Sequence, residues 1–230
     1  MKDVIINSVY FGVAISLLSY FTGIYLKKKL KMSILNPLLV SIILVILFLI
    51  IFDIDYERYN QGGKYLSYFL TPATVCLAIP LYQQLELLKK NFKAIMIGIL
   101  TGVLTSLVSI FILSLIFKLS HELYVSILPK SITTAIGIAV SEELGGISTI
   151  TVAVIVVTGI GGNVIGEGVC RLFKIKNPIS VGLALGTASH AIGTTKALEL
   201  GEIQGAMSSL SIAVAGLMTV VLAPVFANFL

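Results

Sequence analysis

The sequence is poor in charge. Only 12% of its 230 residues are Asp, Glu, Lys or Arg, whereas an ordinary globular domain carries about a quarter charged residues. Uncharged stretches of 19 to 28 residues lie at 4–26, 32–52, 65–85, 94–117, 144–166, 177–195 and 203–230. A helix of about 20 apolar residues crosses the hydrocarbon core of a bilayer. We therefore predict an all-α polytopic membrane protein and exclude a separate soluble domain.

Histidine and cysteine are also scarce, with two of each. The spacing of Cys76 and Cys170 suggests neither a disulfide framework nor a zinc site. The motifs Hx₃H and CxxC are missing, as are SxxK and GxSxG, which removes the common signatures of metal sites and of serine nucleophiles. We therefore predict no enzyme activity, no metal and no cofactor.

The net charge of +5 comes from lysines that cluster beside the uncharged stretches. The positive-inside rule accounts for them, so no nucleic-acid partner is predicted. The dense group at 27–31 (KKKLK) places that loop in the cytoplasm and the N-terminus outside, and the acidic loop at 53–64 should face outward. Because KKKLK is not a small-residue cleavage site, 4–26 reads as a retained helix and not as a signal peptide.

An internal repeat is suggested by a shift of 59 residues, which lays 65–85 over 124–144. Both copies contain helix-weakening residues, which are Pro72 and Pro80 in the first and Pro129 and Gly137 in the second. Repeated segments interrupted by Gly or Pro indicate the binding site of a transporter. We expect one membrane domain over 1–230, made of a two-helix unit (1–60), repeat-like halves (64–118 and 124–171) and C-terminal helices (177–230).

The stretch 131–146 (SITTAIGIAVSEELGG) has two interpretations. Hydroxyls among apolar residues, followed by Glu142 and Glu143, suit a solute site in an interrupted membrane segment. Alternatively, a short helix ends at the water interface with both glutamates solvated. A full crossing at 124–144 would put Arg171 and two lysines outside, against the positive-inside rule. We expect this segment to re-enter, giving seven crossings plus one partial one.

The segment from Pro178 (PISVGLALGTASHAIGTTKALELGE) holds His190 and Lys196 at or near membrane depth. Titratable groups there are costly and indicate function. In the alternative interpretation, His190 bonds to nearby hydroxyls while Lys196 reaches the surface and pairs with Glu199. In the preceding span, Glu167 and Arg171 should form an i,i+4 ion pair.

Glycines at helical spacing predict close helix packing. They form two groups, 98 and 102 in one uncharged stretch, and 159, 162 and 166 in another.

A small carboxylate can be held by half-helix N-termini together with hydroxyl and cationic side chains. The candidate solute-binding residues are Thr71, Pro72, Thr74, Ser131, Thr133, Thr134, Glu142, Glu143, Asn163, Ser189, His190, Gly193, Thr194, Thr195 and Lys196. His190, Glu142 or Glu143 could carry a coupling proton, and the sequence does not choose between a proton and another cation. We expect His190→Ala and Glu142→Gln each to abolish uptake of a small organic anion.

Three motifs, LTPATVCLAIPLYQQ at 70–84, PKSITTAIGIAVSEELGG at 129–146 and GTASHAIGTTKALE at 186–199, resemble signature stretches of the LrgB/CidB family. The resemblance covers essentially the whole chain, although Cys76 stands where members often carry alanine. It implies an antiholin- or holin-like protein of the cytoplasmic membrane that modulates murein hydrolase activity and autolysis, encoded beside a smaller LrgA/CidA-type partner.

Plastid relatives in this family carry glycolate and glycerate, and some bacterial relatives move pyruvate. The resemblance therefore implies a carrier of small monocarboxylates. The alternative is a homo-oligomeric holin-like pore or lysis regulator without specific transport. A carrier saturates and discriminates between acids, whereas a pore passes unrelated solutes.

Overall fold

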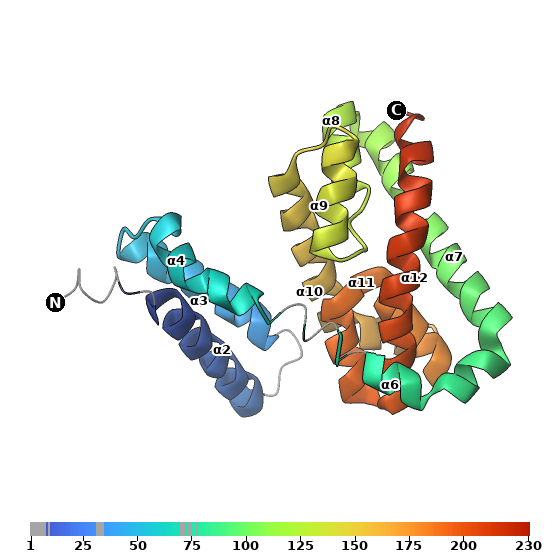
Figure 1. Cartoon of the computed structure of the whole chain (residues 1–230), viewed down its shortest axis with the longest axis horizontal. Coiled ribbons are helices and arrows are strands. Elements are labelled where there is room, and N and C mark those ends of the chain that lie inside the picture. Colours follow the sequence, from blue (N-terminus) through green and yellow to red (C-terminus); the bar gives the residue numbers. More distant parts are fainter. Residues whose placement is uncertain (1–7, 9, 31–34, 70–71, 73–74, 77) are drawn as a thin grey trace. The chain divides into compact units, whose positions relative to one another are not determined.

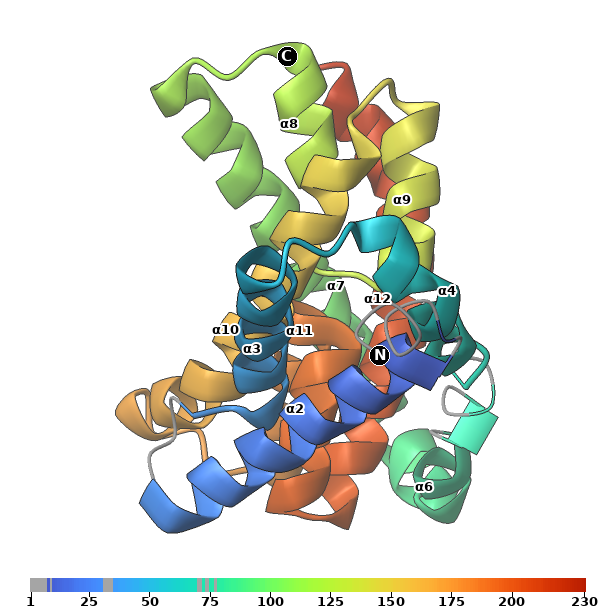
Figure 2. The same cartoon turned by 90° about the vertical axis from the view of Figure 1, so that its left-hand side faces the viewer.

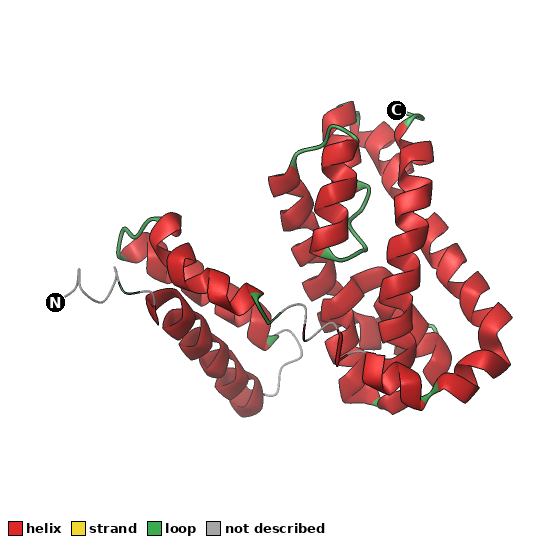
Figure 3. Cartoon of the chain, viewed as in Figure 1, coloured by secondary structure: helices red, strands yellow, loops and turns green. Residues whose placement is uncertain are grey.

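The computed structural model describes residues 8, 10–30, 35–69, 72, 75–76 and 78–230. Every regular element in these ranges is a helix (Figure 3). The chain divides after Cys76 into two compact units, which we call unit one (1–76) and unit two (77–230).

Unit one contains α2 (Tyr10–Leu30), α3 (Pro37–Ile51) and α4 (Tyr56–Ser67). Helix α3 begins at Pro37, because proline suits the first helical turn and Asn36 Oδ1 accepts a bond from Leu38 N at 2.8 Å. The prediction of a loop at 53–64 is wrong, since most of it is α4. That helix is held by Tyr59, whose hydroxyl lies 2.8 Å from Ser16 Oγ on α2.

Unit two contains α6 (Ala78–Gln83), α7 (Leu85–Phe117), α8 (His121–Ile127), α9 (Thr134–Glu143), α10 (Ser148–Leu172), α11 (Pro178–Leu200) and α12 (Glu202–Ala227) (Figure 1). Among the described residues, α7, α10 and α12 are long and apolar enough to cross a membrane. They match three predicted spans and support a helical membrane protein. The predicted total of seven or eight crossings and the internal repeat stay predictions.

Helices α8 and α9 form a hairpin, which we call hairpin one (121–143). Thr151 Oγ1 on α10 donates to Ser126 O at 2.9 Å and also contacts Ser141 Oγ at 2.7 Å. Ser126 on α8 and Ser141 on α9 therefore lie side by side, and the chain reverses in the connection at 128–133. This reversal is what the re-entrant interpretation of the segment requires.

Helix α11 also folds back on itself, and we call it hairpin two (178–200). His190 interrupts it with φ 42° and ψ −138°. Gly182 and Leu198 both pack on the start of α12, because a methyl group on Gly182 would lie 3.0 Å from Gln204 Cα and one on Gly205 would lie 3.3 Å from Leu198 Cα. A straight helix would separate Gly182 from Leu198 by about 24 Å. The run at 177–195 is therefore not one straight helix but part of a hairpin that reverses at His190.

The two hairpins approach from opposite ends of unit two. Hairpin one precedes α10 and hairpin two follows it, so each adjoins a different end of that helix. Figures 1 and 2 show α8 and α9 near the end of α12, and α11 near its beginning. Apolar side chains of α7, α8 and α12, including Ile99, Tyr124 and Met207, form the buried core beside them.

Candidate functional site

A cleft with a volume of about 590 Å³ lies between α7, the tip of hairpin one (the connection at 128–133) and the first half of hairpin two. Half of its 14 lining residues carry hydroxyl groups, and none of these 14 is acidic. The lining residues with polar side chains are Thr101, Thr105, Ser106, Ser109, Lys130, Ser131, Ser180 and Thr187. A cleft with one cation, many hydroxyls and no carboxylate favours a small anion.

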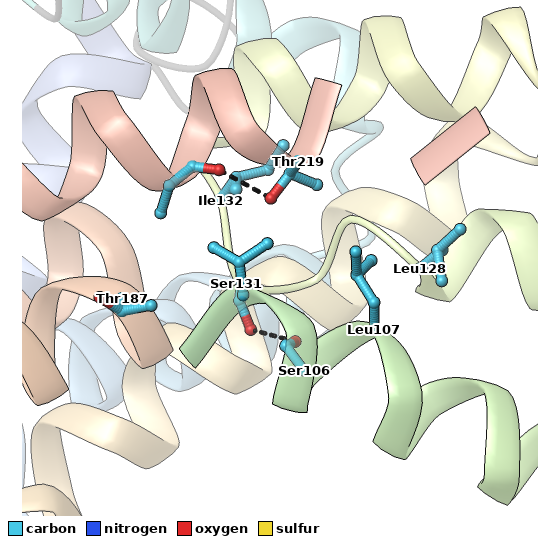
Figure 4. A pocket seen from close by; sticks show the side chains of 9 residues that line it. Ser106, Leu107, Leu128, Ser131, Ile132, Thr187 and Thr219 are labelled. Atoms are coloured by element: carbon cyan, nitrogen blue, oxygen red, sulfur yellow. Dashed lines mark hydrogen bonds between the residues drawn. The ribbon is translucent and has the colours of Figure 1, made fainter. Parts of the chain in front are cut away.

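Lys130 is the cation of the cleft, and the connection between α8 and α9 places it there. Its Nζ donates to Ser131 Oγ at 3.1 Å, and Ser131 Oγ lies 3.0 Å from Ser106 Oγ on α7. Figure 4 shows the Ser106–Ser131 bond joining the tip of hairpin one to α7. These hydrogen bonds hold the tip of hairpin one against α7 and keep the Lys130 ammonium beside the cleft.

The other hydroxyls that α7 contributes to the cleft are already bonded within their own helix. Thr101 Oγ1 donates to Ile97 O at 3.0 Å and Thr105 Oγ1 to Thr101 O at 2.7 Å, while Ser109 Oγ donates to Ser106 O at 2.8 Å. Hydroxyls bonded to the preceding turn are ordinary in helices. These three residues give the cleft a polar wall but have already used their donors.

Glycines on α7 bring it close to hairpin two, as predicted. A methyl group on Gly98 would lie 3.4 Å from Leu183 Cδ1, and one on Gly102 would lie 2.6 Å from Thr187 Cγ2. Because Gly102 has no side chain, Thr187 can approach α7 and line the cleft.

A second, enclosed cavity of about 10 Å³ lies behind the cleft. It shares Ser106, Ser131 and Thr187 with the cleft, and Leu107, Leu128, Ile132 and Thr219 also line it (Figure 4). About 10–15 Å³ is the least space that holds one water molecule. The three shared residues therefore lie between the wide cleft and a small cavity that is just large enough for one water molecule.

His190, the tip of hairpin two, does not line the cleft. It is buried, its Nε2 lies 3.0 Å from Ile155 O on α10, and its ring packs on Gly159. Ile155 also contacts hairpin one, because its Cδ1 packs on Gly137 of α9. Ile155 thus contacts both hairpins.

Three more predicted site residues hold hairpin two together. Ser189 packs on Gly162 of α10, and Gly193 lies against Leu185. Thr194 Oγ1 lies 2.7 Å from Ser208 Oγ on α12. Together with the packing of Gly166 on Leu185, these contacts confirm the close helix packing predicted for the glycines of α10.

Polar groups of α10 bind the second half of hairpin two. Asn163 Nδ2 donates to Ile192 O at 2.7 Å and to Thr195 Oγ1 at 2.9 Å. Lys196 Nζ lies 2.9 Å from Glu167 Oε2 and 3.4 Å from Glu199 Oε2.

Two ion pairs beside this interface were expected from their spacing in the sequence. They are Lys196–Glu199 within hairpin two and Glu167–Arg171 within α10. The bond between Lys196 and Glu167 was missed, because it exists only if α11 folds back along α10.

The remaining predicted residues lie apart from the cleft. Glu142, at the base of hairpin one, accepts a 2.6 Å bond from Ser148 Oγ, and Glu143 beside it is exposed. Thr133 and Thr134 begin α9 and do not line the cleft. Pro72 is exposed in unit one, while Thr71 and Thr74 lie outside the described residues. Of the residues proposed from the sequence, the cleft contains Ser131.

Sequence reasoning missed Lys130, Ser106 and Thr187. Lys130 did leave a signal, because it is the single charge in 123–141, a stretch that would otherwise be an uncharged run of spanning length. Ser106 and Thr187 resemble ordinary helix hydroxyls, and only the packing of α7 on hairpin two distinguishes them.

Comparison with known proteins places this arrangement in a family. Residues 16–229 match the LrgB-like family. The antiholin-like protein LrgB of Bacillus cereus (strain B4264) is 40% identical over 222 residues, which cover 96% of this chain and 96% of that protein. The antiholin-like protein LrgB of Bacillus anthracis (strain CDC 684 / NRRL 3495) has the same identity and coverage. No solved structure matches the chain.

Proposed function

The chain belongs to the LrgB-like family, and on that basis we propose that it carries small monocarboxylates, such as pyruvate or glycolate, across the cytoplasmic membrane. The observation that supports this most directly is the cleft itself, in which Lys130 lies among hydroxyl groups and no lining residue is acidic. Charge-assisted hydrogen bonds from an ammonium to a carboxylate are stronger than neutral ones. Lys130 is therefore the proposed anion-binding group.

The arrangement of the hairpins supports a carrier in a second way. Interrupted helices that meet from opposite ends are typical of transporters, which expose a central site to either side in turn. Here the tip of hairpin one and the first half of hairpin two both contribute to the cleft. We propose that movement of the hairpins opens the cleft alternately, coupled to a proton or another cation.

A second candidate follows from the names of the relatives, which are called antiholin-like. In this alternative the chain forms homo-oligomers, works with a small LrgA/CidA-type membrane protein and regulates murein hydrolase activity and autolysis without specific transport. It requires no anion selectivity in the cleft, which is the property that separates the two candidates.

Reconstitution into liposomes tests the proposal. Uptake of labelled pyruvate, glycolate and lactate would be measured with and without a pH gradient, and with and without the small partner. We expect saturable uptake that other small monocarboxylates inhibit and that glycerol, an uncharged solute of similar size, does not. Passage of glycerol and pyruvate alike, without saturation, would contradict the carrier and support the pore.

A further inference from the structure

Thr187 has a buried hydroxyl without a partner. The residue is 6% exposed, and within the described part of the chain its Oγ1 forms no hydrogen bond. An unpaired buried polar group costs stability, so natural proteins usually satisfy such groups. Ser114 Oγ is also unpaired, but Ser114 lines neither of the cavities described above, whereas Thr187 lines both.

Gly102 sets the orientation of this hydroxyl. A methyl group on Gly102 would lie 2.6 Å from Thr187 Cγ2 but 3.9 Å from Thr187 Oγ1. The methyl group of Thr187 therefore packs against α7, and its hydroxyl is turned away from that contact. The unpaired donor is held in place by packing rather than by a hydrogen bond.

Several hydrogen-bond donors that line the cleft with Thr187 are unused. Ser106 and Ser131 share one bond, which uses one of their two hydroxyl hydrogens and leaves the other. Lys130 gives one hydrogen to Ser131 and retains two. Together with the Thr187 hydroxyl, these unused hydrogens suit a molecule that presents more than one acceptor oxygen.

We propose that Thr187 is a specificity-determining residue, whose hydroxyl donates to the oxygen on C2 of a monocarboxylate bound through its carboxylate to Lys130. This inference deepens the carrier function proposed above and depends on it. An acid without an oxygen at C2 would leave the hydroxyl unpaired. Sites built to bond a substrate oxygen discriminate strongly against analogues that lack it.

The test is a comparison of pyruvate with propionate, which differ at C2, in proteoliposomes of the wild type and of Thr187→Val, Thr187→Ser and Thr105→Val. We expect the wild type to prefer pyruvate. In Thr187→Val, the ratio of pyruvate uptake to propionate uptake should fall about tenfold. Thr187→Ser should keep it, because serine retains the donor. Thr105 lines the same cleft with a hydroxyl already bonded to Thr101 O, so Thr105→Val is the matched control and should keep the preference.

Stability gives an independent readout. Removing a hydroxyl that has no partner should leave the melting temperature of Thr187→Val unchanged or raised, whereas a structural role would lower it. Equal uptake of pyruvate and propionate by the wild type, or an unchanged preference in Thr187→Val, would overturn the assignment of Thr187. Failure of the wild type to transport any acid would instead contradict the carrier function itself.

Discussion

The two hairpins of unit two both reverse the chain, but the residues at their tips differ in what they contact. Hairpin one reverses through a six-residue connection at 128–133, and its tip presents Lys130 and Ser131 to the cleft. Hairpin two reverses at His190 alone, and its tip is buried against α10. Both reversals join two short helical segments, but only the first tip presents polar side chains to the cleft.

The difference shows that polar residues at a helix interruption need not form the binding site. In hairpin two, Ser189, His190 and Thr194 are directed at glycines, a carbonyl group and a serine of neighbouring helices. Their polarity is used to hold a sharp reversal in place. The four predictions below test this division between a binding tip and a packed tip.

The largest effect should come from Lys130→Met at the binding tip. Methionine keeps the length of the side chain but removes the charge, and hydrogen bonds to charged groups contribute about 1.5–3 kcal/mol. We expect uptake of pyruvate at low concentration to fall about ten- to a hundredfold. Lys89→Met, at an exposed position near the start of α7, is the control, and an equal loss in both variants would remove Lys130 from the site.

A substitution that crowds the packed tip of hairpin two should lower the stability of the protein. Gly162→Ala would bring a methyl group into Ser189, and overpacking of this kind costs about 1–3 kcal/mol. We expect a lower melting temperature in detergent. Gly161→Ala is the matched control, because nothing lies within 4 Å of the added methyl group. Alanine stabilises a helix relative to glycine, so a Gly162→Ala protein as stable as the control would contradict the hairpin packing.

A smaller effect should follow from replacing His190. The backbone at φ 42° and ψ −138° is costly for any residue except glycine, by about 1–3 kcal/mol. His190→Gly should therefore be more stable than His190→Ala by about 1 kcal/mol, since both lose the bond to Ile155. Equal stability would mean that the backbone relaxes.

The same His190 variants test the sequence-based prediction that the ring is needed for uptake. Loss of uptake in both variants would assign the effect to the ring. Loss in His190→Ala alone would assign it to the strained backbone.

The smallest effect should come from Glu142→Gln, at the base of hairpin one. Glu142 is exposed and lies about 12 Å along α9 from Thr134, which is farther than the Debye length of about 8 Å at physiological ionic strength, so its charge is largely screened. Although the sequence suggested that this change abolishes uptake, its position leads us to expect uptake within about twofold of wild type. A tenfold loss would restore Glu142 as a site residue.

Several features of unit two could be predicted because they depend on local sequence. The spans corresponding to α7, α10 and α12 follow from length and hydropathy. The Glu167–Arg171 pair follows from i,i+4 spacing, and the close approach of α10 to hairpin two follows from its glycines.

The reversal of α11 could not be predicted in the same way. It occurs at a histidine, in a backbone conformation that histidine does not prefer, and it is stabilised by contacts with α10 and α12. The run at 177–195 is long enough for a crossing, so length alone favoured one straight helix over a hairpin. The contact between Lys196 and Glu167 and the placement of Thr187 depend on this reversal and were missed with it.

The contacts of Ile155 constrain how the two hairpins can move. Its carbonyl oxygen lies 3.0 Å from Nε2 of His190 in hairpin two, while its side chain packs on Gly137 of hairpin one. A rigid spanning helix therefore gives both re-entrant elements a shared point of contact about a third of the way along its length. Displacement of either hairpin would alter that contact, so Ile155 couples the position of one hairpin to that of the other.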